Sequence, residues 1–283
     1  MLSAVWTRLV RLRVTVIYAA ALAAVAVALI ELGPRVQQNV IRYASTNVHN
    51  LSEGRIGTLI GSAFVNEAGP LYIWLPGLVA LLALGELLWE SRRLVVAFVV
   101  GHIGATLIVA AGLAAAIAAG LLSGSVADAA DVGMSYGAVA VLGTFTAAIP
   151  RQWRAAWTGW WLATAVASTA LSGGEFTNIG HTIALVIGMA VGSRFSVAVN
   201  WTPTRYTLLI VGAAFGYLMI AYSDLSTHRV AMWGVAGAVI AWAGWLLLQM
   251  RLVQTNSSAE ASIQSDSQVS GGLSSNSPGI SHS

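Results

Sequence analysis

Long apolar runs alternate with short polar stretches along almost the whole chain. Crossing a hydrocarbon core of about 30 Å as a helix takes about 20 mostly apolar residues. Runs of about this length predict membrane spans at residues 14–32, 71–89, 94–122, 132–149, 156–172, 177–198, 206–222 and 230–250. The first run is longer than the apolar core of a signal peptide, about 7–15 residues, so we expect it to be a retained helix. The pattern therefore predicts an all-α polytopic membrane protein.

Two segments do not have the pattern of a span. Residues 33–70 are predicted to form a long external loop, whose apolar part, 56–65, is too short to cross and is expected to be re-entrant or interfacial. Residues 255–283 are rich in serine and poor in large apolar groups, so they cannot bury enough surface to fold. We expect a disordered cytoplasmic tail there.

The composition agrees with a protein whose solvent is lipid. Hydrophobic residues make up 57% of the chain and charged residues 9%, whereas soluble domains carry roughly a quarter charged residues. The chain has no cysteine, which excludes disulfides and thiolate metal sites. No metal, organic cofactor or nucleic-acid partner is predicted.

Arginine placement predicts the orientation in the membrane. With the N-terminus inside, ten arginines fall on the cytoplasmic side, namely Arg8, Arg11, Arg13, Arg92, Arg93, Arg151, Arg154, Arg194, Arg205 and Arg251. Only Arg35, Arg42, Arg55 and Arg229 fall outside. Cytoplasmic loops carry an excess of basic residues. We therefore expect both termini to be cytoplasmic and the membrane to be the inner (plasma) membrane of the cell.

Few ionisable residues lie inside the predicted spans. Glu86 and Glu90 are near the cytoplasmic end of the second span, and His102 is two turns into the third. Such residues usually face the interior of a helix bundle, and His102 is expected to be a buried, hydrogen-bonded structural histidine. No carboxylate lies near the centre of a span, which makes an ion-coupled transporter a distant alternative.

Ser135 and His181 are the candidate functional pair. Each lies about four residues below the predicted outer end of its span, and both spans run in the same direction. Both spans are rich in small residues, which let helix backbones approach closely. A serine hydroxyl hydrogen-bonded to an imidazole is the minimum arrangement for a base-activated nucleophile, so we expect that hydrogen bond. The alternative is that both are packing residues in Gly/Ala-rich helices.

The motifs around this pair resemble those of the rhomboid family of intramembrane serine proteases. Residues 133–137, Gly-Met-Ser-Tyr-Gly, followed by Gly143, are similar to the nucleophile motif of the family. Residues 178–181, Asn-Ile-Gly-His, followed by Gly188 and Gly192, resemble its histidine helix. Leu59 to Phe64 and Leu84-Gly85-Glu86 resemble the end of the first loop and the end of the second helix. The resemblance covers residues 14–198.

Three departures from the family pattern concern catalysis. Tyr136 stands where a glycine usually follows the nucleophile, and Gly57-Thr58 replaces the expected Trp-Arg pair. The second-helix histidine and asparagine that would stabilise the oxyanion are absent from residues 70–76. Losing one oxyanion donor typically lowers turnover by about 10²–10³. The remaining candidates for the oxyanion site or substrate gate are Gly133, Asn66, Tyr72 and Asn178.

The resemblance implies a six-helix rhomboid-like core at 1–198, followed by two additional transmembrane helices at 199–254 and the tail at 255–283. It implies a serine endopeptidase that cleaves transmembrane substrates near the outer membrane face, with Ser135 as nucleophile and His181 as general base. The alternative is a catalytically inactive rhomboid-like protein that binds membrane helices or assists their assembly. The partners are then membrane-protein substrates or clients within the lipid bilayer.

Reporter fusions test the predicted orientation. A reporter fused at Arg154 and one fused at Gly174 should report opposite sides of the membrane, because one predicted span separates them. A signal from the same side for both would remove the span at 156–172.

Overall fold

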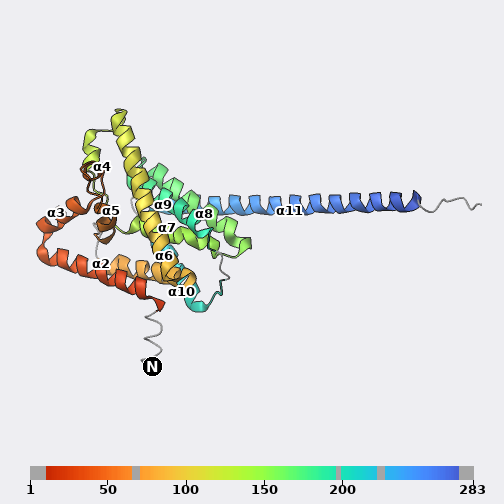
Figure 1. Ribbon diagram of the computed structural model, residues 1–283, viewed down its shortest axis with the longest axis horizontal. Helices are drawn as coiled ribbons and strands as arrows, with labels where there is room; N and C mark the ends of the chain where they lie inside the picture. Colours follow the sequence, from red (N-terminus) through yellow and green to blue (C-terminus); the bar gives the residue numbers. More distant parts are fainter. Residues whose placement is uncertain (1–10, 66–70, 196–198, 222–226, 274–283) are drawn as a thin grey trace, which may run out of the picture.

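The computed structural model describes residues 11–65, 71–195, 199–221 and 227–273, and these residues form helices joined by short connections (Figure 1). The α-helices are α2 (Arg13–Leu32), α3 (Pro34–Ala44), α4 (Val48–Ser52), α5 (Thr58–Gly61), α6 (Leu71–Ala118), α7 (Ser135–Thr144), α8 (Arg151–Leu171), α9 (Phe176–Gly192), α10 (Pro203–Ala221) and α11 (Thr227–Leu273). Three 3₁₀-helices are η1 (Ser62–Phe64), η2 (Gly124–Asp128) and η3 (Phe145–Ala147). The predicted all-α fold is confirmed.

The predicted second and third spans both lie in α6. Glu90 interrupts this helix with φ 65° and ψ 162°, so α6 consists of two helices that meet at a sharp turn. Among the described residues, four helical segments are long and apolar enough to cross a bilayer, namely Arg13–Leu32, Ile73–Ala118, Pro203–Ala221 and Thr227–Leu252. Shorter apolar helices cover Ser135–Ala147 and Phe176–Gly192.

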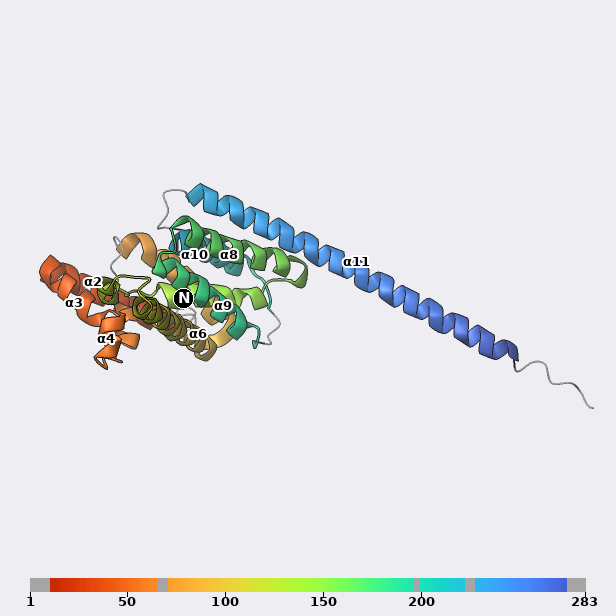
Figure 2. The ribbon, with the colours of Figure 1, turned by 90° about the horizontal axis from the view of Figure 1, so that it is seen from above.

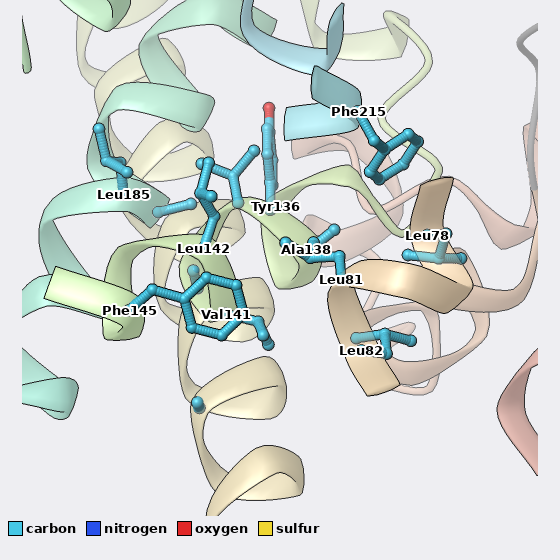
Figure 3. Packing of buried hydrophobic residues seen from close by; sticks show 14 of the residues in the cluster. Leu78, Leu81, Leu82, Tyr136, Ala138, Val141, Leu142, Phe145, Leu185 and Phe215 are labelled. Atoms are coloured by element: carbon cyan, nitrogen blue, oxygen red, sulfur yellow. The ribbon is translucent and has the colours of Figure 1, made fainter. Parts of the chain in front are cut away.

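Helix α7 lies at the centre of the bundle, and every residue from Tyr136 to Thr144 is buried. Side chains from α6, α9 and α10 meet around it (Figure 3). Glycines make these contacts possible: a Cβ on Gly188 of α9 would lie 2.0 Å from the Ala140 carbonyl oxygen, and one on Gly101 of α6 would lie 2.0 Å from the Ala140 Cβ. The close packing predicted from the small residues is confirmed.

Glu86 fixes α2 to the first half of α6. Its buried carboxylate accepts hydrogen bonds from the backbone N–H groups of Val14 and Thr15 at 3.0 and 2.9 Å, and from the Thr15 hydroxyl at 2.7 Å. These N–H groups belong to the first turn of α2, where no intrahelical acceptor is available. The Ser91 hydroxyl, just past the turn at Glu90, donates to the same carboxylate at 2.7 Å.

Helices α10 and α11 pack on different partners. Helix α10 packs on the first half of α6, where Gly77 faces the Phe215 ring and Gly212 faces the Leu81 backbone. Helix α11 packs along α8, with Gly159 and Gly237 at the point of closest approach. Figure 2 shows α11 lying beside α8 and then extending well past the bundle.

The structure corrects two sequence predictions. Helix α7 begins at Ser135, three residues later than the predicted start at 132. Helix α11 continues to Leu273, so residues 255–273, predicted to be disordered, are helical. A helix satisfies its backbone hydrogen bonds internally and needs no core for that purpose. The rest of the predicted tail, 274–283, lies outside the described residues.

Gly188→Ala tests the central packing. The added methyl would meet the Ala140 carbonyl, so we expect a loss of about 1–3 kcal/mol in the free energy of unfolding. Gly112→Ala is the matched control, because Gly112 lies in α6 with no atom within 4 Å of the position that a Cβ would take, and alanine favours a helix by about 1 kcal/mol over glycine. Thermal unfolding in detergent measures both. Equal stability of the two variants would contradict this packing.

Candidate functional site

Ser135 is the first residue of α7, and the chain in front of it is held by the segment that follows α3. The Gly133 N–H donates to the Ser62 carbonyl at 2.9 Å, and Gly133 has φ 125°, a conformation that residues with a side chain rarely adopt. The Thr46 N–H donates to the Asp131 carbonyl at 3.0 Å, and the Asp131 N–H donates to the Ser45 hydroxyl at 2.7 Å. These bonds fix the residue at which α7 begins.

His181 is the sixth residue of α9 and is buried. Neither ring nitrogen has a hydrogen-bond partner in the part of the chain that the structure describes. The Tyr136 ring meets the imidazole edge-on, with 5.4 Å between ring centroids and an angle of 82°. A Cβ on Gly180 would lie 2.2 Å from Tyr136 Cζ, so the tyrosine ring fits only because residue 180 is a glycine.

The expected hydrogen bond between Ser135 and His181 is absent, so that expectation is wrong. The physical reason lies in the start of α7. Neighbouring residues on a helix do not share a face, and the residue that faces His181 is Tyr136. The equal offsets expected from the sequence are also not found, because Ser135 is at the end of its helix and His181 is more than a turn inside α9.

Of the other candidate residues, the structure describes Gly133 and Asn178 in full. Asn178 is buried in the first turn of α9, and its carbonyl accepts a hydrogen bond from the Thr182 hydroxyl at 3.0 Å. Asn66 lies outside the described residues. Tyr72 is in the first turn of α6, and its side chain is also outside the described part. Among the described residues, no cluster of three or more histidine and acidic side chains could hold a metal ion.

His102 takes part in a chain of hydrogen-bonded side chains. Of its members, only His102 was a candidate from the sequence. Its Nε2 lies 3.1 Å from the Ser62 hydroxyl, which lies 3.0 Å from the Thr46 hydroxyl. Thr46 donates to the Thr58 carbonyl at 2.8 Å. All three side chains are buried, and the chain joins residues 46–62 to the second half of α6. The prediction of a buried, hydrogen-bonded structural histidine is confirmed. The only sequence signal for its partners was Ser62 within the apolar stretch 56–65, since Thr46 lies between the polar residues Ser45 and Asn47.

Asp131 lies four residues before the start of α7. Burial raises the pKa of its carboxyl to about 6, and the nearby Tyr136 hydroxyl opposes part of this shift. The Tyr136 hydroxyl is buried, and its geometry falls short of a hydrogen bond to any described residue. The raised pKa means that the folded protein binds the Asp131 proton more tightly than the unfolded chain does.

Asp131→Asn should therefore change how stability depends on pH. In the wild type, the stabilisation from protonated Asp131 is complete below its unfolded pKa of about 4 and is lost as the pH rises through about 6. Asparagine is neutral throughout, so the variant should gain about 1–3 kcal/mol over the wild type between pH 4 and 7, since one pKa unit corresponds to about 1.4 kcal/mol. Melting temperatures across this range measure the effect. Asp128→Asn, at an exposed carboxyl in the same loop, is the control. Parallel curves for Asp131→Asn and the wild type would contradict the assignment.

Comparison with known proteins identifies the family. A family model described as rhomboid-like protein matches residues 9–196, which is more than half of the 283 residues. No curated protein and no solved structure matches the chain. The matched region contains α2 to α9 and leaves out α10 and α11. This multi-pass membrane protein belongs to the family of rhomboid-like proteins.

Proposed function

We propose that this rhomboid-like protein binds transmembrane helices of other membrane proteins and does not cleave them. The observation that carries this proposal is the contact between Tyr136 and His181. A serine whose hydroxyl is not hydrogen-bonded to a base is a weak nucleophile. Here the tyrosine ring packs against the imidazole, and Ser135 has no hydrogen bond to His181.

An apolar cavity offers a place for a client helix to dock. It has a volume of about 250 Å³ and lies between α2, the α5–η1 segment and both halves of α6. Of its lining residues only Tyr18 and His102 carry polar side-chain atoms, and these are used inside the protein, since Tyr18 donates to the Ala63 carbonyl and His102 pairs with Ser62. The cavity therefore suits a large apolar side chain of a neighbouring transmembrane helix.

Cleavage of transmembrane substrates is the second candidate function, and one observation favours it. Both His181 ring nitrogens are buried without partners, and each unsatisfied polar atom costs about 1–3 kcal/mol. A group kept in that state at such a cost is a candidate general base, with the half-buried Ser135 as nucleophile. In both cases the proposed location is the plasma membrane, with both termini in the cytoplasm.

Two variants separate these functions. Ser135→Ala should keep client binding and cellular activity at the wild-type level, because no reaction depends on its hydroxyl. Val99→Trp should fill the cavity and reduce client binding at least severalfold, because Val99 lines it. Val100→Trp is the matched control, since Val100 is similarly exposed and does not line the cavity. Co-purification from membranes with a defined client measures binding. Loss of activity in Ser135→Ala would overturn the proposal in favour of the protease.

A further inference from the structure

A second groove lies between α8 and α11, away from His181 and from the apolar cavity. Its volume is about 610 Å³. One wall is a single face of α8 from Arg151 to Leu162, and the other is formed by Ala241, Trp245 and Gln249 of α11. Eleven residue steps along α8 correspond to a length of roughly 16 Å at 1.5 Å per residue.

The two ends of this groove differ in chemistry. Arg151, Arg154 and Gln249 lie at one end, and Gly159, Leu162 and Ala241 lie at the other. The cationic end is at the first turn of α8, where the predicted topology places the membrane surface. Trp153, in the first turn of α8, stacks on Trp242 of α11, with 6.5 Å between ring centroids. Tryptophan is enriched at membrane interfaces, so the groove runs from the interface into the hydrocarbon region.

The positive charge at the interfacial end has no acidic partner among the described residues. Neither Arg151 nor Arg154 has an ion-pair partner among the described residues. Arg154 is held in place, because its Nη2 donates to the Ala147 and Ile149 carbonyls at 3.0 and 3.2 Å. The first turn of α8 has no side-chain cap, and its free N–H groups add positive partial charge at the same end.

We propose that this groove binds an anionic glycerophospholipid. Its phosphate would contact Arg151 and Arg154, and one acyl chain would lie along Gly159, Leu162 and Ala241 beside Trp245. The apolar wall distinguishes a lipid from a free phosphate. The lining has no acidic residue to pair with a choline or ethanolamine group, so a lipid with net negative charge is preferred over a zwitterionic one. Basic pockets between transmembrane helices are typical sites for such headgroups. Lipid binding here does not depend on whether the protein cleaves its partners.

Native mass spectrometry of the full-length protein in detergent tests the proposal, with phosphatidylglycerol and phosphatidylcholine of the same chain length offered together. The wild type should retain phosphatidylglycerol in clear preference. Arg151→Gln should lower its affinity about fivefold, since one arginine near a lipid headgroup contributes about 1 kcal/mol. Arg92→Gln, at an exposed arginine on α6, should have no effect. Ala155→Trp should reduce binding of the lipid by filling the groove while leaving both arginines in place.

Glycerol 3-phosphate distinguishes the two sources of a phosphate group. It should not compete with the lipid at millimolar concentration, because it has no chain for the apolar wall. Full competition would show a site for soluble anions and overturn the proposal. Equal retention of the two lipids, or equal loss in Arg151→Gln and Arg92→Gln, would overturn it as well. Melting temperatures of all variants without lipid identify any that fail to fold, and Arg151→Gln leaves the carbonyl contacts of Arg154 intact.

Discussion

The burial of α7 between α6 and α9 is the constraint on which the rest of this structure depends. In lipid, apolar surface alone does not hold helices together, so close backbone contact and interhelical hydrogen bonds must do so. Gly101, Gly143 and Gly188 provide that contact, each at a point where a methyl group would overlap a neighbouring residue. Trp89 adds a hydrogen bond from its indole N–H to the Thr144 hydroxyl at 2.9 Å. Little freedom remains for α7 to rotate or slide.

This constraint determines which side chain faces His181. With α7 fixed in register, Tyr136 faces α9, and Gly180 leaves the space that its ring needs. Moving Ser135 toward the imidazole would require rotation of α7. That rotation would turn the close contacts at Gly101, Gly143 and Gly188 into steric overlaps. The fixed packing therefore connects the fold to the proposed non-cleaving function. The groove between α8 and α11 depends on a different pair of helices, which meet at Gly159 and Gly237. The proposed lipid binding is therefore independent of the packing of α7.

The sequence predicted the helices well because the length of an apolar run reflects the thickness of the bilayer. It also predicted the role of the small residues in α7 and α9 and the buried state of His102. It did not predict the start of α7, which depends on the hydrogen bond between Gly133 and Ser62, residues far apart in the chain. The contact between Tyr136 and His181 follows from that start. The groove between α8 and α11 required knowledge of which helices are neighbours, and the positions of Arg151 and Arg154 alone do not give it.

Labelling of the wild-type protein by a mechanism-based serine-hydrolase probe tests the central claim most directly. The probe forms a covalent adduct only with a serine that a base activates. Mass spectrometry of the protein in detergent or nanodiscs would then detect any adduct and its position. We expect no adduct on Ser135, because the His181 ring contacts Tyr136 and has no hydrogen bond to Ser135. An adduct on Ser135 that disappears in His181→Ala would contradict this expectation and would show that the two residues form a working catalytic pair.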